Sequence, residues 1–156
     1  MKILFVSYHY WPPHFGGELK ISIERFESLV KRGHQVTVLT SGVPGLPARE
    51  TRNGIEIRRS PIVHDSRLGR GGRRLLFPLW AQTQMKELDF DLLHFGGIGG
   101  ISPLHQLLGM AQLSRLADRK GAKKVIVHSL ADSETEALST RGRQARWRNR
   151  TLRQMD

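Results

Sequence analysis

The chain has 156 residues, which is enough for one domain with a buried core. It contains no cysteine, so a disulfide framework and a thiolate metal site are excluded, and no apolar run approaches the ~20 residues that span a bilayer. The formal net charge of +11 favours anionic partners, which include phosphates, lipid head groups and nucleic acid.

The first forty residues predict a strand, a loop, a helix and a second strand. Ile3–Ser7 is a short apolar run without a following cleavage site, which indicates a strand buried on both faces rather than a signal peptide. After a loop over Tyr8–Gly17, apolar residues recur every three or four positions from Leu19 to Val30, and Gly33 stands where a helix cap belongs. Val36–Thr40 is the second strand, and the helical crossover predicts that it is parallel to the first.

The middle of the chain predicts a loop, a strand, a helix and another strand. Gly42–Gly54 is rich in glycine and proline and is expected to be a loop, followed by a short alternating strand over Ile55–Arg58. Leu75–Leu88 is expected to be helical with Pro78 near its start, where proline is tolerated. Leu92–Phe95 is the next strand.

The last third repeats the alternation of helix and strand. Ser102 and Pro103 are typical of a helix cap and of the first helical position, and Gly121 ends that helix. Lys124–His128 is expected to be a strand, and residues 134–156 to be a basic helical tail. The whole pattern predicts one α/β domain over residues 1–156, with a Rossmann-like, doubly wound, mostly parallel sheet that is incomplete.

Three segments follow strands at the edge of the sheet where ligands bind in such folds: Tyr8–Gly17, His94–Gly100 and His128–Glu134. In the first of them, Gly16 and Gly17 stand just before a helix. That place suits backbone amides that contact a diphosphate, and it equally suits a turn that needs a positive φ. The spacing is neither that of a dinucleotide fingerprint nor that of a phosphate loop.

Several motifs together resemble those of family 4 glycosyltransferases, which have the GT-B fold. The matching stretches are Lys2–Val6, Trp11–Gly17, Gly33–Thr40, Asp91–His94, Val125–Ser129 and the final Arg153–Asp156.

The resemblance implies the N-terminal, acceptor-side half of an enzyme that moves a sugar from a nucleotide-sugar donor to an acceptor hydroxyl. It implies retention of the anomeric configuration, no catalytic metal and no cofactor. The C-terminal donor-binding domain with its Glu-x7-Glu motif is expected to be missing, so the isolated chain is expected to be inactive. The expected location is the cytoplasm, or the inner face of the membrane as a peripheral protein.

The resemblance also assigns roles to individual residues. Gly16 and Gly17 match the glycines that approach the donor diphosphate, and His128 matches the catalytic histidine near the transferred sugar. The residues expected to bind the acceptor are His14, His94, Gly96, Gly97 and Asp132. Plainer roles stay open, because His128 can be a core histidine, His14 a loop-packing residue and Asp132 a helix cap.

Asp89-Phe90-Asp91 has the D-x-D pattern that holds a metal in other transferases. Here it precedes a strand, so it is expected at the amino edge of the sheet, far from the three segments above. A structural role and no metal are therefore predicted.

The tail carries Trp147 among six arginines, of which Arg143, Arg146 and Arg150 share one face of a helix. It is either a solvated helix face, a surface that docks on anionic lipid, or a site for nucleic acid or an acidic partner. Two rival functions stay open for the whole chain: a non-catalytic Rossmann-like binding module and a basic nucleic-acid-binding domain.

Overall fold

Strand β1 (Lys2–Val6) lies inside the sheet, as its apolar run predicts. It pairs in parallel with β2 (Gln35–Gly42) on one side and with β5 (Leu92–Phe95) on the other. Its side chains alternate between two hydrophobic cores. Ile3 and Phe5 belong to one core, and Leu4 and Val6 belong to the other.

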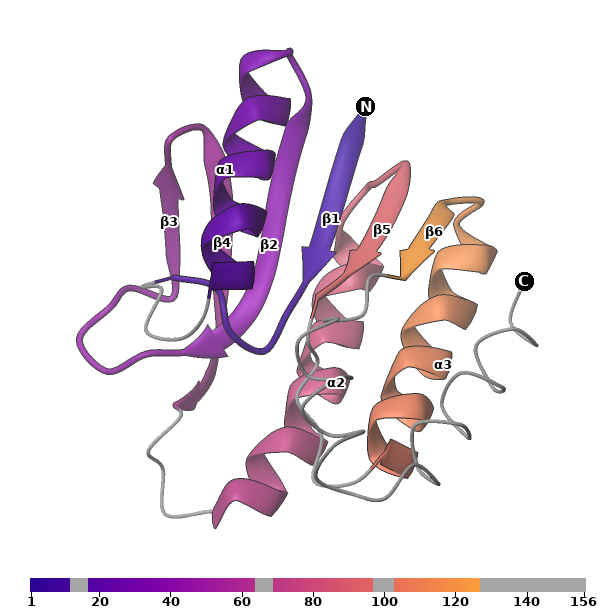
Figure 1. The fold of residues 1–156 in the computed structure, drawn as a ribbon. Helices are drawn as coiled ribbons and strands as arrows, with labels where there is room; N and C mark the ends of the chain where they lie inside the picture. The colour runs from indigo at the N-terminus through magenta and orange to yellow at the C-terminus, as the bar shows by residue number, and fades with distance from the viewer. Residues whose placement is uncertain (12–16, 64–68, 97–102, 127–156) are drawn as a thin grey trace.

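The computed structural model describes residues 1–11, 17–63, 69–96 and 103–126. They form a six-stranded sheet with the order β3-β4-β2-β1-β5-β6 (Figure 1). Strands β4 (Ile55–Val63) and β6 (Lys123–Ile126) are parallel to their neighbours, whereas β3 (Arg49–Arg52) runs antiparallel to β4 at the edge. The chain moves outward from β1 to β4 and then returns to β5. The doubly wound, Rossmann-like prediction is confirmed.

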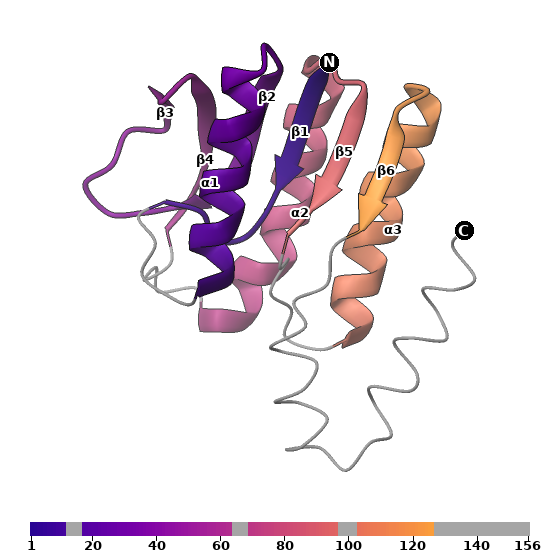
Figure 2. The same ribbon diagram turned by 45° about the horizontal axis from the view of Figure 1, so that its top comes forward.

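Helices cover both faces of this sheet unequally. Helix α1 (Gly17–Lys31) packs Ile23 and Phe26 on one face, while α2 (Gly69–Glu87) and α3 (Pro103–Arg119) cover the other face with Phe77 and Leu113 among their buried residues (Figures 1 and 2). The predicted strand end at His128 and the tail over 134–156 lie outside the described residues.

Among the described elements, α1 is the single helix on its face of the sheet. Two aromatic residues, Tyr10 and Trp11, cover more of that face. Tyr10 belongs to the buried core there, and its ring meets that of Phe5 edge-on with centroids 5.9 Å apart. Trp11 packs against the same core and is half-buried. The segment after β1, which the sequence marks as a ligand loop, therefore begins as part of the core.

Helix α2 begins at Gly69, six residues earlier than predicted, and this places Pro78 well inside the helix rather than near its start. The apolar pattern begins only at Leu75, so it shows the part of α2 that packs on the sheet and not the glycine-arginine run before it. Pro78 is buried and packs against Gly109 of α3. A Cβ on Gly109 would lie 3.1 Å from Cγ of Pro78, so this glycine gives the proline ring its room.

The loop predicted over Gly42–Gly54 is wrong in its second half, because β3 and β4 form a hairpin. Its turn residues Asn53 and Gly54 have φ values of 50° and 79°, as expected for a type I′ turn. The Asn-Gly pair was therefore the available signal for this hairpin. The amide Nδ2 of Asn53 donates to Oε1 of Glu27 on α1 at 2.7 Å, and β4 continues to Val63 instead of ending at Arg58.

Comparing alanine at Gly54 and at Gly45 will measure how tightly the hairpin packs on α1. Both glycines have positive φ values, but a Cβ on Gly54 would lie 2.6 Å from Cγ1 of Val30, whereas nothing lies within 4 Å of one on Gly45. We expect Gly45→Ala to lower the free energy of unfolding by about 1 kcal/mol, from backbone strain alone. We expect Gly54→Ala to lower it by about 2–4 kcal/mol, because overpacking adds to the strain. Equal losses of unfolding free energy for the two variants in denaturant titrations would show that the hairpin shifts to accommodate the added Cβ at no cost.

Candidate functional site

The ends of β1 and β5 form the point at which the order of the strands reverses. The two strands are neighbours, yet the chain leaves β1 toward α1 on one face and leaves β5 toward α3 on the other (Figure 2). The amide of Gly96 donates to the carbonyl of Val6 at 2.9 Å, so the pairing continues to the last residue of β1. In parallel sheets this reversal opens a crevice beyond the carboxyl ends of the strands, where ligands bind.

The segment after β1 is tied to the end of β2. The carbonyl of Tyr8 accepts three hydrogen bonds: from the Ser41 amide at 3.2 Å, from Oγ of Ser41 at 2.5 Å and from Oγ1 of Thr40 at 3.3 Å. Oγ of Ser7 donates to the carbonyl of His9 at 2.8 Å. Hydrogen bonds therefore fix the direction of the chain at residues 7–9, where the candidate ligand loop begins.

Neither Thr40 nor Ser41 was predicted to support the site. Both are buried, at 1% and 4% exposure, and both lie near the carboxyl end of β2. A pair of hydroxyl residues at the carboxyl end of a buried strand needs partners for its polar groups. The Thr40-Ser41 pair was therefore the sequence signal for hydrogen bonds between the end of β2 and a neighbouring segment.

Gly17 is the first residue of α1, so the helix begins one residue earlier than predicted, because the sequence placed Gly17 just before it. Helix α1 begins at the edge of the sheet where β1 ends (Figure 1). The first amides of a helix have no partner inside it and carry a partial positive charge. Gly17 thus stands where an anion can meet free backbone amides, and its contact with a donor diphosphate stays a prediction.

His94 lies in the second-last position of β5, with its side chain on the α1 face of the sheet. Its ring meets Phe5 and Phe26 edge-on, with centroid separations of 5.1 and 5.4 Å. Burial, and secondarily the charge of Arg25, lowers the pKa of His94 below its ordinary value of 6.5. The described contacts of His94 are thus packing contacts of a ring that is neutral at neutral pH, and its predicted contact with acceptor stays a prediction.

Gly96 is required by packing. A Cβ at this position would lie 2.5 Å from Cζ of Phe5 and 2.8 Å from both Cβ and Oγ of Ser7. Since its amide already bonds to Val6, Gly96 brings the chain past β1 at close range. Its predicted role in binding acceptor remains untested.

Most of the predicted site residues lie outside the described part of the chain. They are His14, Gly16, Gly97, His128, Asp132, Arg143, Arg146, Trp147 and Arg150. The described residues therefore include the carboxyl ends of β1 and β5 and the start of α1. They do not test the groups that are predicted to touch substrate.

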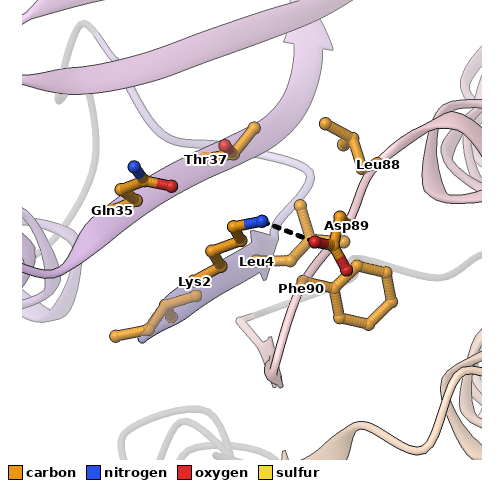
Figure 3. Close-up of a pocket in the computed structure, with 8 residues that line it drawn as sticks. Lys2, Leu4, Gln35, Thr37, Leu88, Asp89 and Phe90 are labelled. Carbon is orange, nitrogen blue, oxygen red and sulfur yellow. Dashed lines mark hydrogen bonds and ion pairs between the residues drawn. The ribbon is translucent and has the colours of Figure 1, made fainter.

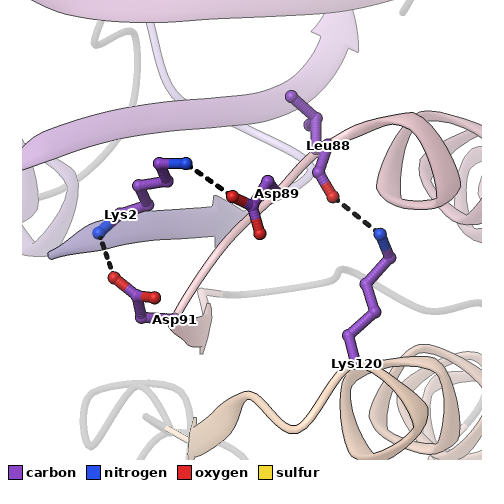
Figure 4. Close-up of polar contacts among 5 residues, drawn as sticks. All are labelled: Lys2, Leu88, Asp89, Asp91 and Lys120. Carbon is purple, nitrogen blue, oxygen red and sulfur yellow. Dashed lines mark hydrogen bonds and ion pairs between the residues drawn. The ribbon is translucent and has the colours of Figure 1, made fainter.

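The D-x-D motif lies at the amino edge of the sheet, as predicted. Oδ2 of Asp91 accepts the backbone amide of Lys2 at 2.7 Å, and Asp89 pairs with Nζ of Lys2 (Figure 4). This hydrogen bond and the opposite charge lower the pKa of Asp89 and raise that of Lys2. Both carboxylates thus anchor the start of β1 to the start of β5, so the predicted structural role is confirmed.

The same edge contains a helix cap. Nζ of Lys120, just after α3, donates to the carbonyls of Leu88 at 2.8 Å and Lys86 at 3.2 Å, at the end of α2 (Figure 4). A cation at the C-terminus of a helix bonds its last carbonyls and complements its dipole. These contacts join α2, α3 and the strand starts.

A small cavity at this edge is lined by Lys2, Thr37, Asp89 and Phe90, among others (Figure 3). Its volume is about 30 Å³. One water molecule occupies about 30 Å³ in the liquid, so the cavity is far too small for a sugar or a nucleotide.

The described residues contain neither a cluster of metal ligands nor a helix that could span a membrane. No group of three or more His, Cys, Asp or Glu side chains in these parts of the chain could hold a metal ion. Within the same ranges, no helix has the length and apolar character needed to cross a membrane. The predicted absence of a metal remains a prediction for the whole chain.

Comparison with known proteins gives two matches. The family model of the glycosyl transferase 4-like domain matches residues 24–156. A protein of Methanocaldococcus jannaschii described as an uncharacterized glycosyltransferase is 35% identical over 94 residues. The matched region covers 59% of this chain and 21% of that protein, so the chain spans about a fifth of the length of the relative.

The packing of His94 predicts a loss of stability in acid. Because burial lowers its pKa in the folded state, the folded protein resists protonation that the unfolded chain accepts. Stability is thus full above pH ~6.5 and falls as the pH drops below that value. We expect the melting temperature to fall between pH 7.5 and 5.5, and to fall less in His94→Gln.

Arg25→Gln provides a graded comparison for this measurement. Burial is the larger cause of the shift and Arg25 the smaller, so this variant should flatten the pH dependence less than His94→Gln. Parallel pH profiles for wild type and His94→Gln would show that His94 is not the group responsible.

Proposed function

Because the chain belongs to the glycosyl transferase 4-like domain family, we propose that it forms the acceptor-side half of a GT-B sugar transferase. The match over residues 24–156 carries this proposal. The Rossmann-like sheet with its reversal between β1 and β5 supports it, because that reversal is where such sheets bind ligands.

In the proposed reaction, the bond between the anomeric carbon of the donor sugar and the diphosphate oxygen breaks. A new bond forms to the acceptor oxygen, and the proton of the acceptor hydroxyl leaves to a base such as the departing phosphate. The products are the glycosylated acceptor and a nucleoside diphosphate. We propose that the configuration at the anomeric carbon is retained and that no metal takes part.

We assign some of the predicted site residues to the donor and others to the acceptor. The amides of Gly16 and of Gly17, the first residue of α1, approach the donor diphosphate as it gains negative charge. The fixed direction of the chain after β1 and the unpaired amides of α1 support this role for Gly17. We propose, as the family resemblance implies, that His128 acts at the transferred sugar. The residues proposed to bind the acceptor are His14, His94, Gly96, Gly97 and Asp132.

We further propose that a second domain outside these 156 residues supplies the remaining contacts with the nucleotide-sugar donor. In a GT-B enzyme the reactants meet between two domains, so holding both in place supplies much of the rate. The relative from Methanocaldococcus jannaschii is much longer than the matched region, because the match covers only 21% of its length. Its length leaves room for a further domain.

Substituting Gly17 tests the donor role directly. In a protein that joins this chain to a donor-binding domain, Gly17→Val should lower kcat/KM for the donor by at least about 10-fold. The side chain would hold the diphosphate away from the amides, and a tenfold loss corresponds to only about 1.4 kcal/mol. Initial rates measured with a panel of labelled sugar nucleotides give the comparison.

Ile21→Ala is the matched control, because Ile21 is exposed one turn later on α1. It should leave the donor kinetics unchanged. Normal kinetics in a folded Gly17→Val variant would mean that Gly17 serves only the helix start.

The basic tail is proposed to dock on anionic lipid. Each arginine near such a surface contributes about 1 kcal/mol, and only one face of the tail can meet the bilayer, so we expect salt-sensitive attachment in the micromolar range. Replacing Arg143, Arg146 and Arg150 by Gln should abolish most of it. Co-sedimentation with vesicles of anionic and of neutral lipid measures the effect, and equal binding to both would contradict the proposal.

A further inference from the structure

Two exposed leucines flank the contact between α2 and α3. Pro78 of α2 and Gly109 of α3 are buried where the helices meet, and a Cβ on Gly109 would lie only 3.1 Å from Cγ of Pro78. The residues next to them in the sequence, Leu79 and Leu108, are 50% and 54% exposed. One residue turns a helix by about 100°, so both leucines lie on the solvent side of the buried contact.

Both leucines belong to series of exposed residues that follow one face of their helix. The spacing is three, four and three residues on α2, and four, three and four on α3. The two series are Leu76, Leu79, Thr83 and Lys86 on α2, and Leu108, Gln112, Arg115 and Arg119 on α3. Each series therefore leads from leucine to a basic residue without an acidic one.

The two series lie on one surface of the molecule. Helices α2 and α3 are side by side on the same face of the sheet and run in the same direction, because both lead from its carboxyl edge to its amino edge (Figure 2). Each helix contains one acidic residue, Glu87 or Asp118, which stands one position off the series and so lies about 100° round the helix. The surface thus has an apolar end and a cationic end.

We propose that this surface of α2 and α3 docks on an anionic lipid bilayer. The leucines enter the boundary between head groups and acyl chains, where the apolar face of an interfacial helix lies. The basic residues stand seven or more positions further along, about 10 Å away, and their long side chains extend to the lipid phosphates. The proposal does not depend on sugar transfer, and it uses described residues outside the basic tail.

The residue types favour a bilayer over a protein partner. Protein interfaces centre on aromatic anchors and are depleted in lysine, whereas protruding leucines beside flexible cations suit a fluid and negatively charged surface. A second copy of the chain is disfavoured because each copy has a formal net charge of +11.

The absence of cysteine allows a label to be placed at one chosen position. Leu79→Cys and Leu108→Cys variants of the 156-residue chain are labelled with an environment-sensitive fluorophore and mixed with vesicles of phosphatidylglycerol and phosphatidylcholine in equal parts. We expect the emission of both labels to shift to the blue and nitroxide-bearing lipid to quench it. Vesicles of phosphatidylcholine alone should have little effect.

Ile21→Cys is the matched control for the labels. Ile21 is 56% exposed, much like the two leucines, but it lies on α1 at the opposite face of the sheet. Its label should not respond to vesicles. Equal responses at Ile21 and Leu79, or no response at either leucine, would overturn the proposal.

Substitution measures the contribution of the apolar end. Burying a half-exposed leucine is worth a factor of about 5 in affinity, so Leu79→Gln together with Leu108→Gln should weaken vesicle binding by about 10–30-fold. Ile21→Gln should bind like the wild type. All three positions are exposed, so the melting temperatures should stay close to that of the wild type.

The cationic end is tested in the same way. Arg115→Gln and Arg119→Gln should each weaken binding by about 5-fold at low salt, and this difference should shrink as salt is added. Arg32→Gln is the matched control, because Arg32 is exposed just after α1 and lies outside both series. Equal losses in Arg32→Gln and Arg115→Gln would show that net charge alone, rather than this surface, sets the affinity.

Two further outcomes would also overturn the proposal. If replacing Arg143, Arg146 and Arg150 by Gln abolishes binding while the double leucine variant binds normally, the tail alone docks on lipid. If the labels respond to rising protein concentration without vesicles and not to lipid, the surface joins copies of the chain. The surface is supported if the labels at Leu79 and Leu108 still enter the bilayer in the tail variant.

Discussion

The burial of β1 on both faces is the constraint from which the rest of the structure follows. Because Ile3 and Phe5 face one core and Leu4 and Val6 face the other, both faces of the sheet must be covered. Parallel neighbours on both sides also require the chain to leave β1 outward and to return across the sheet. That return creates the reversal between β1 and β5, which is where the candidate site lies.

The order of elements was predictable where apolar periodicity is strong. The runs over Ile3–Ser7 and Val36–Thr40 predicted their strands well, and family membership confirms the resemblance read from the motifs. The hairpin was missed because β3 is short, exposed and charged, so only its Asn53-Gly54 turn marked it. The start of α2 was missed because glycine and arginine carry no apolar period, although the chain is helical there.

The site was predictable at the level of position and less so at the level of individual side chains. Gly17 and the D-x-D motif lie at the edges that strand order dictates. His94 shows what residue type alone leaves out. Strand alternation turns its ring toward Phe5 and Phe26, and the sequence does not reveal this packing without the register of β5. Tyr8 and Trp11 contact Ser41 and Arg52, which come from strands far away in the sequence, so only the sheet brings these pairs together.

The central claim is that this chain supplies one side of a transferase and needs a donor-binding domain to act. The most direct measurement is sugar transfer by the purified chain, alone and mixed with a separately expressed donor-binding domain of the GT-B type. We predict no transfer by either part alone and labelled product when both are present. Robust transfer by the isolated chain, or none by the mixture when each part is folded and the two parts joined in one chain are active, would contradict the account.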